Sequence, residues 1–270
     1  MPQVISRDGT HIGYERQGSG PLVILVGGAT QYRAVDMRTP NMVQALASDF
    51  TVVTFDRRGR GESNDTWPYA VEREVEDIAA LMDAMGGEAY LFGMSSGAVL
   101  ALEAAAILPR AVKALALYEP PIDPARSAAS YQQDHAEMAE LAAEGKGREM
   151  MSNFLGSVGM SPEALAGFQQ SPSWPAFEAV GLTIEHDYRI LADARQGDTP
   201  PERWQNAIMP VLVIDGDKSF PFMAAGADWV ASGLHNGQRI TLADQSHDVD
   251  PLVLAPLLNV FFQMGSVVVH

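Results

Sequence analysis

The sequence predicts an α/β fold: a doubly wound, mostly parallel sheet of about eight strands with a helical lid inserted into it. Three observations support this prediction. Short apolar runs alternate along the chain with segments of helical periodicity. Several of these runs lack the alternation of a half-exposed strand, as expected of parallel strands that are buried on both faces. One long segment of helical composition interrupts the alternation between two of the predicted strands.

The predicted elements alternate in chain order. Residues 4–5 and 11–15 flank the turn Asp8-Gly9, a pattern typical of an N-terminal hairpin. The other predicted strands are apolar runs, at residues 22–26, 51–56, 90–92, 114–118, 211–215 and 238–242. Helical patterns lie between or after them, at residues 41–47, 71–85, 96–108 and 252–264. This order is typical of a parallel sheet with helices on both faces.

The segment 122–205 contains no apolar run comparable to the predicted strands and is rich in Ala, Glu and Met. We therefore predict that residues 1–121 and 206–270 form the core of the fold. Residues 122–205 would form a helical lid over a functional site at the carboxyl ends of the strands. Most apolar side chains of the lid should form its own core, while a few Met and aromatic residues line a pocket. Trp174 and Phe177 are the two lid residues expected to influence substrate choice.

Composition limits the class of protein. A chain of 270 residues that is 47% hydrophobic is long enough for one large domain with an insertion. Its net charge of −16 disfavours nucleic acid and anionic membranes, so a small molecule is the expected partner, and no oligomeric state is predicted. The absence of Cys excludes disulfides and thiolate chemistry. The N-terminus lacks a signal-peptide pattern and no apolar run approaches about 18 residues, so we expect a cytoplasmic protein without membrane spans.

The stretch Gly93-Met94-Ser95-Ser96-Gly97 indicates chemistry most directly. It lies between a predicted strand and a predicted helix, which is the context of the nucleophile elbow G-x-S-x-G. So tight a turn strains the backbone of Ser95, and the flanking glycines remove Cβ atoms that would clash there. Ser95 is therefore the predicted nucleophile; the alternative is a serine that merely caps a helix.

Four motifs in the same order resemble the α/β-hydrolase superfamily: Gly27-Gly28, Asp56 to Ser63, Gly93 to Gly97 and Ser246-His247-Asp248. The resemblance covers nearly the whole chain apart from the lid. Within the superfamily, the chain is most similar to small, lid-bearing serine hydrolases such as esterases, lactonases and haloperoxidase-like enzymes. The resemblance implies the α/β-hydrolase fold, His247 as the general base and no cofactor.

The acid of the triad departs from the family pattern. Family members usually carry it three residues after a glycine in the loop that follows the strand at 211–215, and Ser219 occupies that place here. Three carboxylates remain: Glu119, Asp217 and Asp215. Glu119 directly follows the preceding predicted strand, which resembles the arrangement in a group of haloalkane dehalogenases. Glu119 is therefore the favoured acid, and Asp217 is the alternative.

An oxyanion hole needs two backbone N–H groups. The resemblance implies that one comes from Ser96, at the start of a helix, and the other from Ala29, where Gly27-Gly28 replaces the family's His-Gly. The arginines of the glycine-rich motif, Arg57 and Arg60, lie in a stretch without the P-loop order, so we expect them in surface or scaffold salt bridges. No metal site is predicted.

The predicted function is a cofactor-independent serine hydrolase. It would cleave a small ester, lactone or thioester through an acyl-enzyme on Ser95, with His247 as general base. A serine at the elbow argues against dehalogenase and epoxide-hydrolase activity, since those relatives use a carboxylate nucleophile. Two alternatives stay open: a C–C hydrolase, lyase or cyclase of a biosynthetic pathway, and a non-catalytic receptor for a small ligand.

Overall fold

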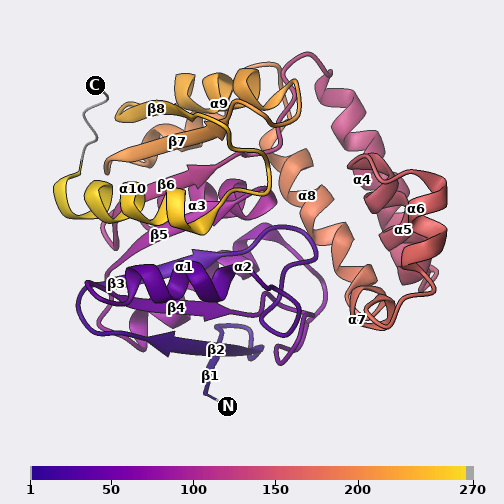
Figure 1. The fold of residues 1–270 in the computed structure, drawn as a ribbon, viewed down its shortest axis with the longest axis horizontal. Helices are drawn as coiled ribbons and strands as arrows, with labels where there is room; N and C mark the ends of the chain where they lie inside the picture. The colour runs from indigo at the N-terminus through magenta and orange to yellow at the C-terminus, as the bar shows by residue number, and fades with distance from the viewer. Residues whose placement is uncertain (1, 266–270) are drawn as a thin grey trace.

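A single eight-stranded sheet forms the centre of the protein (Figure 1), for which a computed structural model describes residues 2–265. The strands lie in the order β1-β2-β4-β3-β5-β6-β7-β8. β2 pairs antiparallel with β1 and β4, and all other neighbours are parallel, so the predicted sheet is confirmed. The strands are β1 (Gln3–Ile5), β2 (His11–Gln17), β3 (Leu22–Val26), β4 (Thr51–Phe55), β5 (Ala89–Met94), β6 (Val112–Tyr118), β7 (Val211–Gly216) and β8 (Gly237–Leu242).

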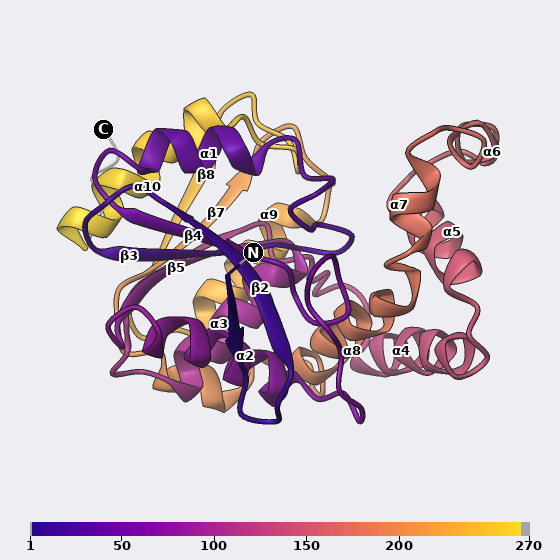
Figure 2. The same cartoon turned by 90° about the horizontal axis from the view of Figure 1, so that it is seen from below.

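Helices cover both faces of the sheet (Figure 2). One buried apolar cluster joins α1 and α10 to one face, and another joins α2, α3 and α9 to the other. The pattern did not predict α9, a short helix whose Gly226 is a poor helix former. These helices are α1 (Thr39–Leu46), α2 (Val71–Asp83), α3 (Ser96–Ile107), α9 (Met223–Ser232) and α10 (Pro251–Met264).

The chain leaves the sheet after β6 and returns to it before β7, and the segment between them is helical. Figures 1 and 2 show α4 to α7 to one side of the sheet core, with α8 between them and the core. Met138, Met150, Met151 and Trp174 are buried in a cluster that belongs largely to this segment. Its elements are α4 (Ala128–Ala143), α5 (Gly147–Ser157), α6 (Pro162–Phe168), α7 (Trp174–Glu178), η1 (Gly181–Thr183), α8 (Ile184–Ala194) and η2 (Glu202–Asn206).

The strand order brings the loops after β3, β5, β6, β7 and β8 to one edge of the sheet, because parallel strands end on the same side. The register keeps the strand ends level: Val26 lies opposite Gly93, and Tyr118 lies opposite both Met94 and Ile214. Loops from distant parts of the sequence therefore meet there. Within residues 2–265, no helix is both long enough and apolar enough to cross a membrane.

Candidate active site

Ser95 occupies the sharp turn between β5 and α3, with φ 56° and ψ −131°. A Cβ on Gly93 would lie 2.4 Å from the Gly97 carbonyl oxygen, and one on Gly97 would lie 2.4 Å from the Gly27 carbonyl oxygen. Both positions therefore require glycine. The Ser95 N–H donates to the Tyr118 carbonyl at 2.9 Å, which holds the turn against β6. The local backbone is that of a strained strand–turn–helix, as the motif predicts.

Backbone strain gathers at this edge of the sheet. Within residues 2–265, the non-glycine residues with positive φ are Thr30, Ser95, Glu119 and Asp244. They lie in four different loops, after β3, β5, β6 and β8 respectively. A conformation of this kind costs about 1–3 kcal/mol, persists only where its surroundings enforce it, and is concentrated at functional sites. The strain thus marks the same edge as the sequence motifs do.

Glu119 and His247 are brought together from the loops after β6 and β8. His247 Nδ1 lies 2.6 Å from Glu119 Oε2, and the Glu119 side chain is completely buried. The carboxylate also accepts the Gly216 N–H at 2.9 Å and the Ser219 hydroxyl at 2.7 Å. Glu119 is thus oriented by donors from the end of β7 and the loop after it, as well as by the imidazole.

The other candidate carboxylates lie elsewhere. Asp217, whose side chain is 40% exposed, accepts the Asp244 N–H at 2.7 Å. Asp215 is buried and accepts from Arg239 Nη1 at 2.6 Å. Ser219 occupies the place where the family usually carries its acid, and here it donates a hydrogen bond to the carboxylate that contacts the histidine.

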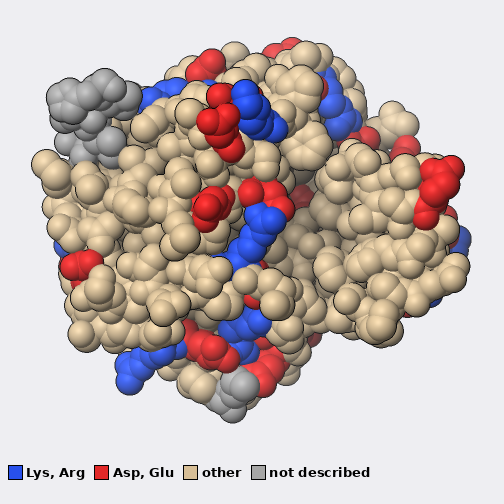
Figure 3. Space-filling model, in the orientation of Figure 1, with Lys and Arg blue, Asp and Glu red and all other residues tan. Residues whose placement is uncertain are grey.

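Ser95 and His247 line the same cavity, which has a volume of about 780 Å³. It lies between the carboxyl edge of the sheet and the inserted helices, and Figure 3 shows a hollow between these two parts of the molecule. Phe177 lines this cavity, whereas Trp174 is buried within the cluster of the inserted segment. The indole of Trp174 packs inside that segment, so of the two residues expected to influence substrate choice only Phe177 borders the cavity. The inserted segment also contributes lining side chains from Phe154, Leu155, Val158, Tyr188 and Leu191.

The loop after β3 passes directly beside the nucleophile elbow. A Cβ on Gly28 would lie 2.8 Å from the Ser95 Cβ, and Ala29 lines the cavity. Ser96 is the first residue of α3, where backbone N–H groups precede the intrahelical hydrogen-bond ladder. The Gly28 N–H donates to Gln31 Oε1 at 2.5 Å. No pattern in the sequence indicates this brace, which holds a loop that has Gly27-Gly28 in place of His-Gly.

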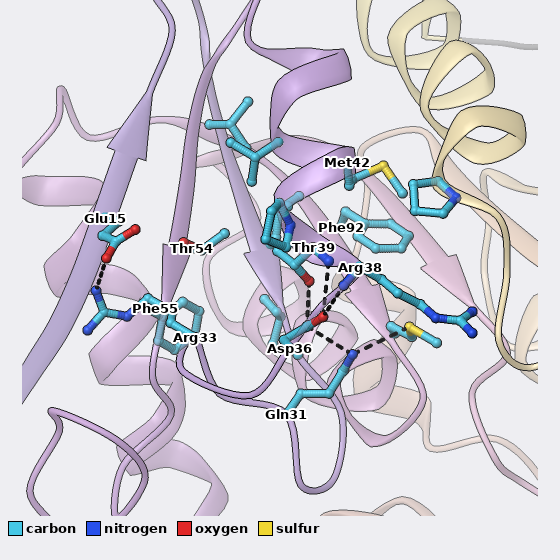
Figure 4. A pocket seen from close by; sticks show the side chains of 18 of the residues that line it. Glu15, Gln31, Arg33, Asp36, Arg38, Thr39, Met42, Thr54, Phe55 and Phe92 are labelled. Atoms are coloured by element: carbon cyan, nitrogen blue, oxygen red, sulfur yellow. Dashed lines mark hydrogen bonds and ion pairs between the residues drawn. The ribbon is translucent and has the colours of Figure 1, made fainter. Parts of the chain in front are cut away.

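Gln31 also borders a smaller cavity of about 240 Å³ on the other side of this loop (Figure 4). Its Nε2 donates to Asp36 Oδ2 at 3.3 Å, and Asp36 Oδ1 accepts the Thr39 N–H at 3.0 Å. The brace of the loop is thus anchored at the start of α1. Gln31, Met94 and Asp248 line both cavities, so the two lie back to back across these side chains.

A buried cluster of charges lies next to the loop after β3. Arg57 forms a bidentate pair with Glu74 at 2.7 and 2.6 Å, and its Nη1 also donates to Asp187 Oδ1 at 2.6 Å. Arg60 Nη2 donates to Asp187 Oδ2 at 2.6 Å. Burial opposes ionisation of Asp187, but the guanidinium groups of Arg60 and Arg57 outweigh it and lower the pKa of Asp187 to about 2.

Arg57 and Arg60 are therefore buried scaffold residues, which is one of the two alternatives that the sequence left open. Their partner Asp187 lies on α8 in the inserted segment. Nothing in the local sequence around Asp187 indicates this role. Within the described chain, no group of three or more His, Asp or Glu side chains is placed to hold a metal ion.

Comparison with known proteins places this chain in a family. The model of the alpha/beta hydrolase family matches residues 23–256. The solved alpha/beta hydrolase from Sphaerobacter thermophilus DSM 20745 is 43% identical, with a TM-score of 0.80 and coverage of 97% of this chain and 100% of that one. The uncharacterized hydrolase YraK from Bacillus subtilis (strain 168) is 36% identical over 120 residues, a match that spans 42% of either chain. A thermophilic esterase from Thermogutta terrifontis is similar in fold, at 19% identity, 97% coverage of both chains and a TM-score of 0.67.

Proposed function

Because the chain belongs to the alpha/beta hydrolase family, we propose that it is a cofactor-independent serine hydrolase that cleaves a small ester, lactone or thioester. The observation that carries the proposal is the 2.6 Å contact between His247 Nδ1 and Glu119 Oε2. A carboxylate that accepts from Nδ1–H selects the tautomer whose Nε2 is free to act as a base. Ser95 lines the same cavity as His247 and is the nucleophile whose hydroxyl proton this base removes.

In the first half of the reaction, Ser95 Oγ attacks the carbonyl carbon of the substrate while His247 Nε2 takes the hydroxyl proton. The backbone N–H groups of Ala29 and Ser96 donate hydrogen bonds to the carbonyl oxygen and stabilise the negative charge that develops on it. When the tetrahedral intermediate collapses, the imidazolium of His247 gives its proton to the leaving alcohol or thiol. Ser95 is left as an ester of the acyl group.

In the second half, a water molecule takes the place of the leaving group. His247 removes a proton from the water, which attacks the acyl-enzyme through the same oxyanion geometry. Collapse of this second intermediate returns the proton to Ser95 Oγ and releases the carboxylic acid. The Glu119 carboxylate accepts from Nδ1–H and stabilises the imidazolium in each half.

The lining of the cavity supports a substrate class. Its volume of about 780 Å³ lies within the range of small-molecule pockets. Most side chains around it are apolar or aromatic, and the guanidinium of Arg126 is paired with Asp134 at 2.6 Å. This lining favours neutral, largely apolar esters over anionic ones. The inserted segment supplies many of these side chains, so we propose that it acts as the lid of the site.

The test combines covalent labelling by an organofluorophosphonate with turnover of a chromogenic short-chain ester. We expect one adduct, on Ser95, and a loss in kcat of at least about 10³-fold for Ser95→Ala, with the fold intact by circular dichroism. Ser232→Ala removes an exposed hydroxyl on α9 and is the matched control; it should label and turn over as the wild type does. An adduct elsewhere, or a Ser95→Ala variant as active as the wild type, would overturn the proposal.

A further inference from the structure

One carboxylate links the loop after β3 to the start of α3. Arg60 Nη2 donates to Asp187 Oδ2 at 2.6 Å, while Arg60 Nη1 donates to the Gly28 carbonyl at 2.7 Å. The Ser96 hydroxyl donates to the other oxygen of Asp187, Oδ1, at 2.7 Å. Asp187 therefore connects the two segments that carry the proposed oxyanion donors, the N–H groups of Ala29 and Ser96.

The contact with the Gly28 carbonyl bears directly on the donor at Ala29, because the carbonyl and the Ala29 N–H belong to the same peptide group. That peptide is trans, so its C=O and N–H point in opposite directions. A guanidinium that holds the carbonyl on the buried side therefore directs the N–H to the opposite side. A cation on the carbonyl oxygen also polarises the peptide, which strengthens the N–H as a donor.

These contacts restrict the movement of the Arg60 guanidinium and of the groups that it joins. Arg60 and Ser96 are no more than 2% exposed and Asp187 is 3% exposed, so water competes little for their hydrogen bonds. The third arm of the guanidinium, Arg60 Nε, donates to the Thr183 hydroxyl at 2.9 Å. A planar fork that is fixed on three partners cannot rotate away from the carbonyl.

We propose that Asp187 and Arg60 are positioning residues for the oxyanion hole, and this inference rests on the proposed function. Asp187 fixes Arg60, which orients the Gly28–Ala29 peptide, and it fixes Ser96 through the serine hydroxyl. Asp187 lies on α8, within the segment inserted between β6 and β7. The segment that lines the cavity thus also orients the groups that stabilise the transition state.

The experiment compares an oxygen ester with its thionoester analogue, in which sulfur replaces the carbonyl oxygen. Sulfur is a weak acceptor, so the rate ratio of oxygen ester to thionoester measures how well the oxyanion donors are aligned. Arg60→Lys keeps the charge but loses the fork. We expect kcat for the oxygen ester to fall about 10- to 100-fold and the rate ratio to fall with it, while KM changes little.

Arg58→Lys is the matched control. Arg58 is also fully buried, but its donors go to Asp77, Asp8 and the Arg73 carbonyl, away from the loop after β3. This variant should lose stability to a similar degree and keep the rate ratio of the wild type. A ratio that falls equally in both arginine variants would mean that the effect is general loosening of the fold, and it would overturn the inference.

Ser96→Ala keeps the inference testable if Arg60→Lys does not fold. It removes the hydroxyl that donates to Asp187 but leaves the backbone N–H in place, and the ratio should fall about 3- to 10-fold. An unchanged ratio in every folded variant overturns the inference and leaves the proposed function intact. If the wild type hydrolyses neither substrate, or Ser95→Ala hydrolyses them equally well, the proposed function and the inference fall together.

Discussion

Replacing Glu119 with Gln separates the proposed catalytic role of this side chain from its structural role. The carboxylate accepts from the Gly216 N–H at 2.9 Å through Oε1, and from Ser219 at 2.7 Å and His247 at 2.6 Å through Oε2. Glutamine has the same size, but one of its two terminal atoms is an NH₂ group that only donates. The backbone N–H of Gly216 cannot turn away, so we expect the amide oxygen to take the place of Oε1.

The amide nitrogen then takes the place of Oε2, where it meets two groups that can reverse their roles. The Ser219 hydroxyl can rotate to accept, and the imidazole can change tautomer so that Nδ1 accepts and Nε2 carries the proton. Every buried polar atom in this set keeps a partner, so stability should change by no more than about 1 kcal/mol. The histidine, however, now holds a proton on the nitrogen that must act as the base. The wrong tautomer of the catalytic histidine lowers kcat by about 10³- to 10⁴-fold, which raises the activation free energy by about 4–5 kcal/mol.

The assay is kcat on a short-chain ester at a pH where imidazole is neutral, with thermal unfolding measured in parallel. Asp217→Asn is the control. Asp217 is 40% exposed, an amide oxygen can keep the hydrogen bond that it accepts from the Asp244 N–H, and its ion pair with Lys218 is exposed. The kcat of this variant should stay within about threefold of the wild type. If Glu119→Gln keeps a rate within tenfold of the wild type, the reasoning is refuted and His247 works without this carboxylate. A large loss in Asp217→Asn alone would return the acid to the loop after β7.

Three further substitutions probe the inserted segment. The pKa of Asp187 is about 2, below the ordinary value for a carboxyl group, so its ionised form stabilises the fold above pH 4 and this contribution is lost as the pH falls toward 2. Asp187→Asn should lower the free energy of unfolding by about 2–3 kcal/mol at pH 7 and by much less near pH 2.5, as measured by urea unfolding; equal losses at both pH values would contradict this. Phe177→Ala, which alters the cavity wall, should raise KM for longer acyl chains and leave kcat on a short ester nearly unchanged, whereas Trp174→Ala should cost about 3–5 kcal/mol of stability. Identical chain-length profiles for wild type and Phe177→Ala would mean that this ring does not contact substrate.

Much of this arrangement could be predicted from the sequence because it depends on local patterns. Apolar runs, helical periodicity and turn residues indicate the sheet and most of its helices, and parallel strands necessarily end at one edge. That edge predicts which loops meet, including those of Ser95 and His247. Local patterns do not predict which carboxylate at that edge contacts the His247 imidazole. Glu119 and Asp217 both follow a strand, and only the folded chain distinguishes them.

The contacts that the sequence did not predict join distant segments. Ser96 and Asp187 are 91 residues apart, and Arg60 and Asp187 are 127 apart. Asp187 lies in a helix without a motif, where an acidic residue is most often a solvated one. The sequence therefore gives no reason to expect Asp187 to be buried. Only the folded chain shows that it contacts the two buried arginines Arg57 and Arg60.

The position of the proposed acid, Glu119, also has a structural reason. β6 and β7 are neighbours, and Tyr118 lies opposite Ile214 in their register, so the loops that follow them begin side by side. A carboxylate on either loop can therefore occupy nearly the same space beside the imidazole. Glu119 fills that space from β6, and Ser219, in the place that usually carries the acid, donates to it from the loop after β7. What the proposed chemistry requires is a carboxylate oxygen at His247 Nδ1, and two adjacent strand ends can supply it.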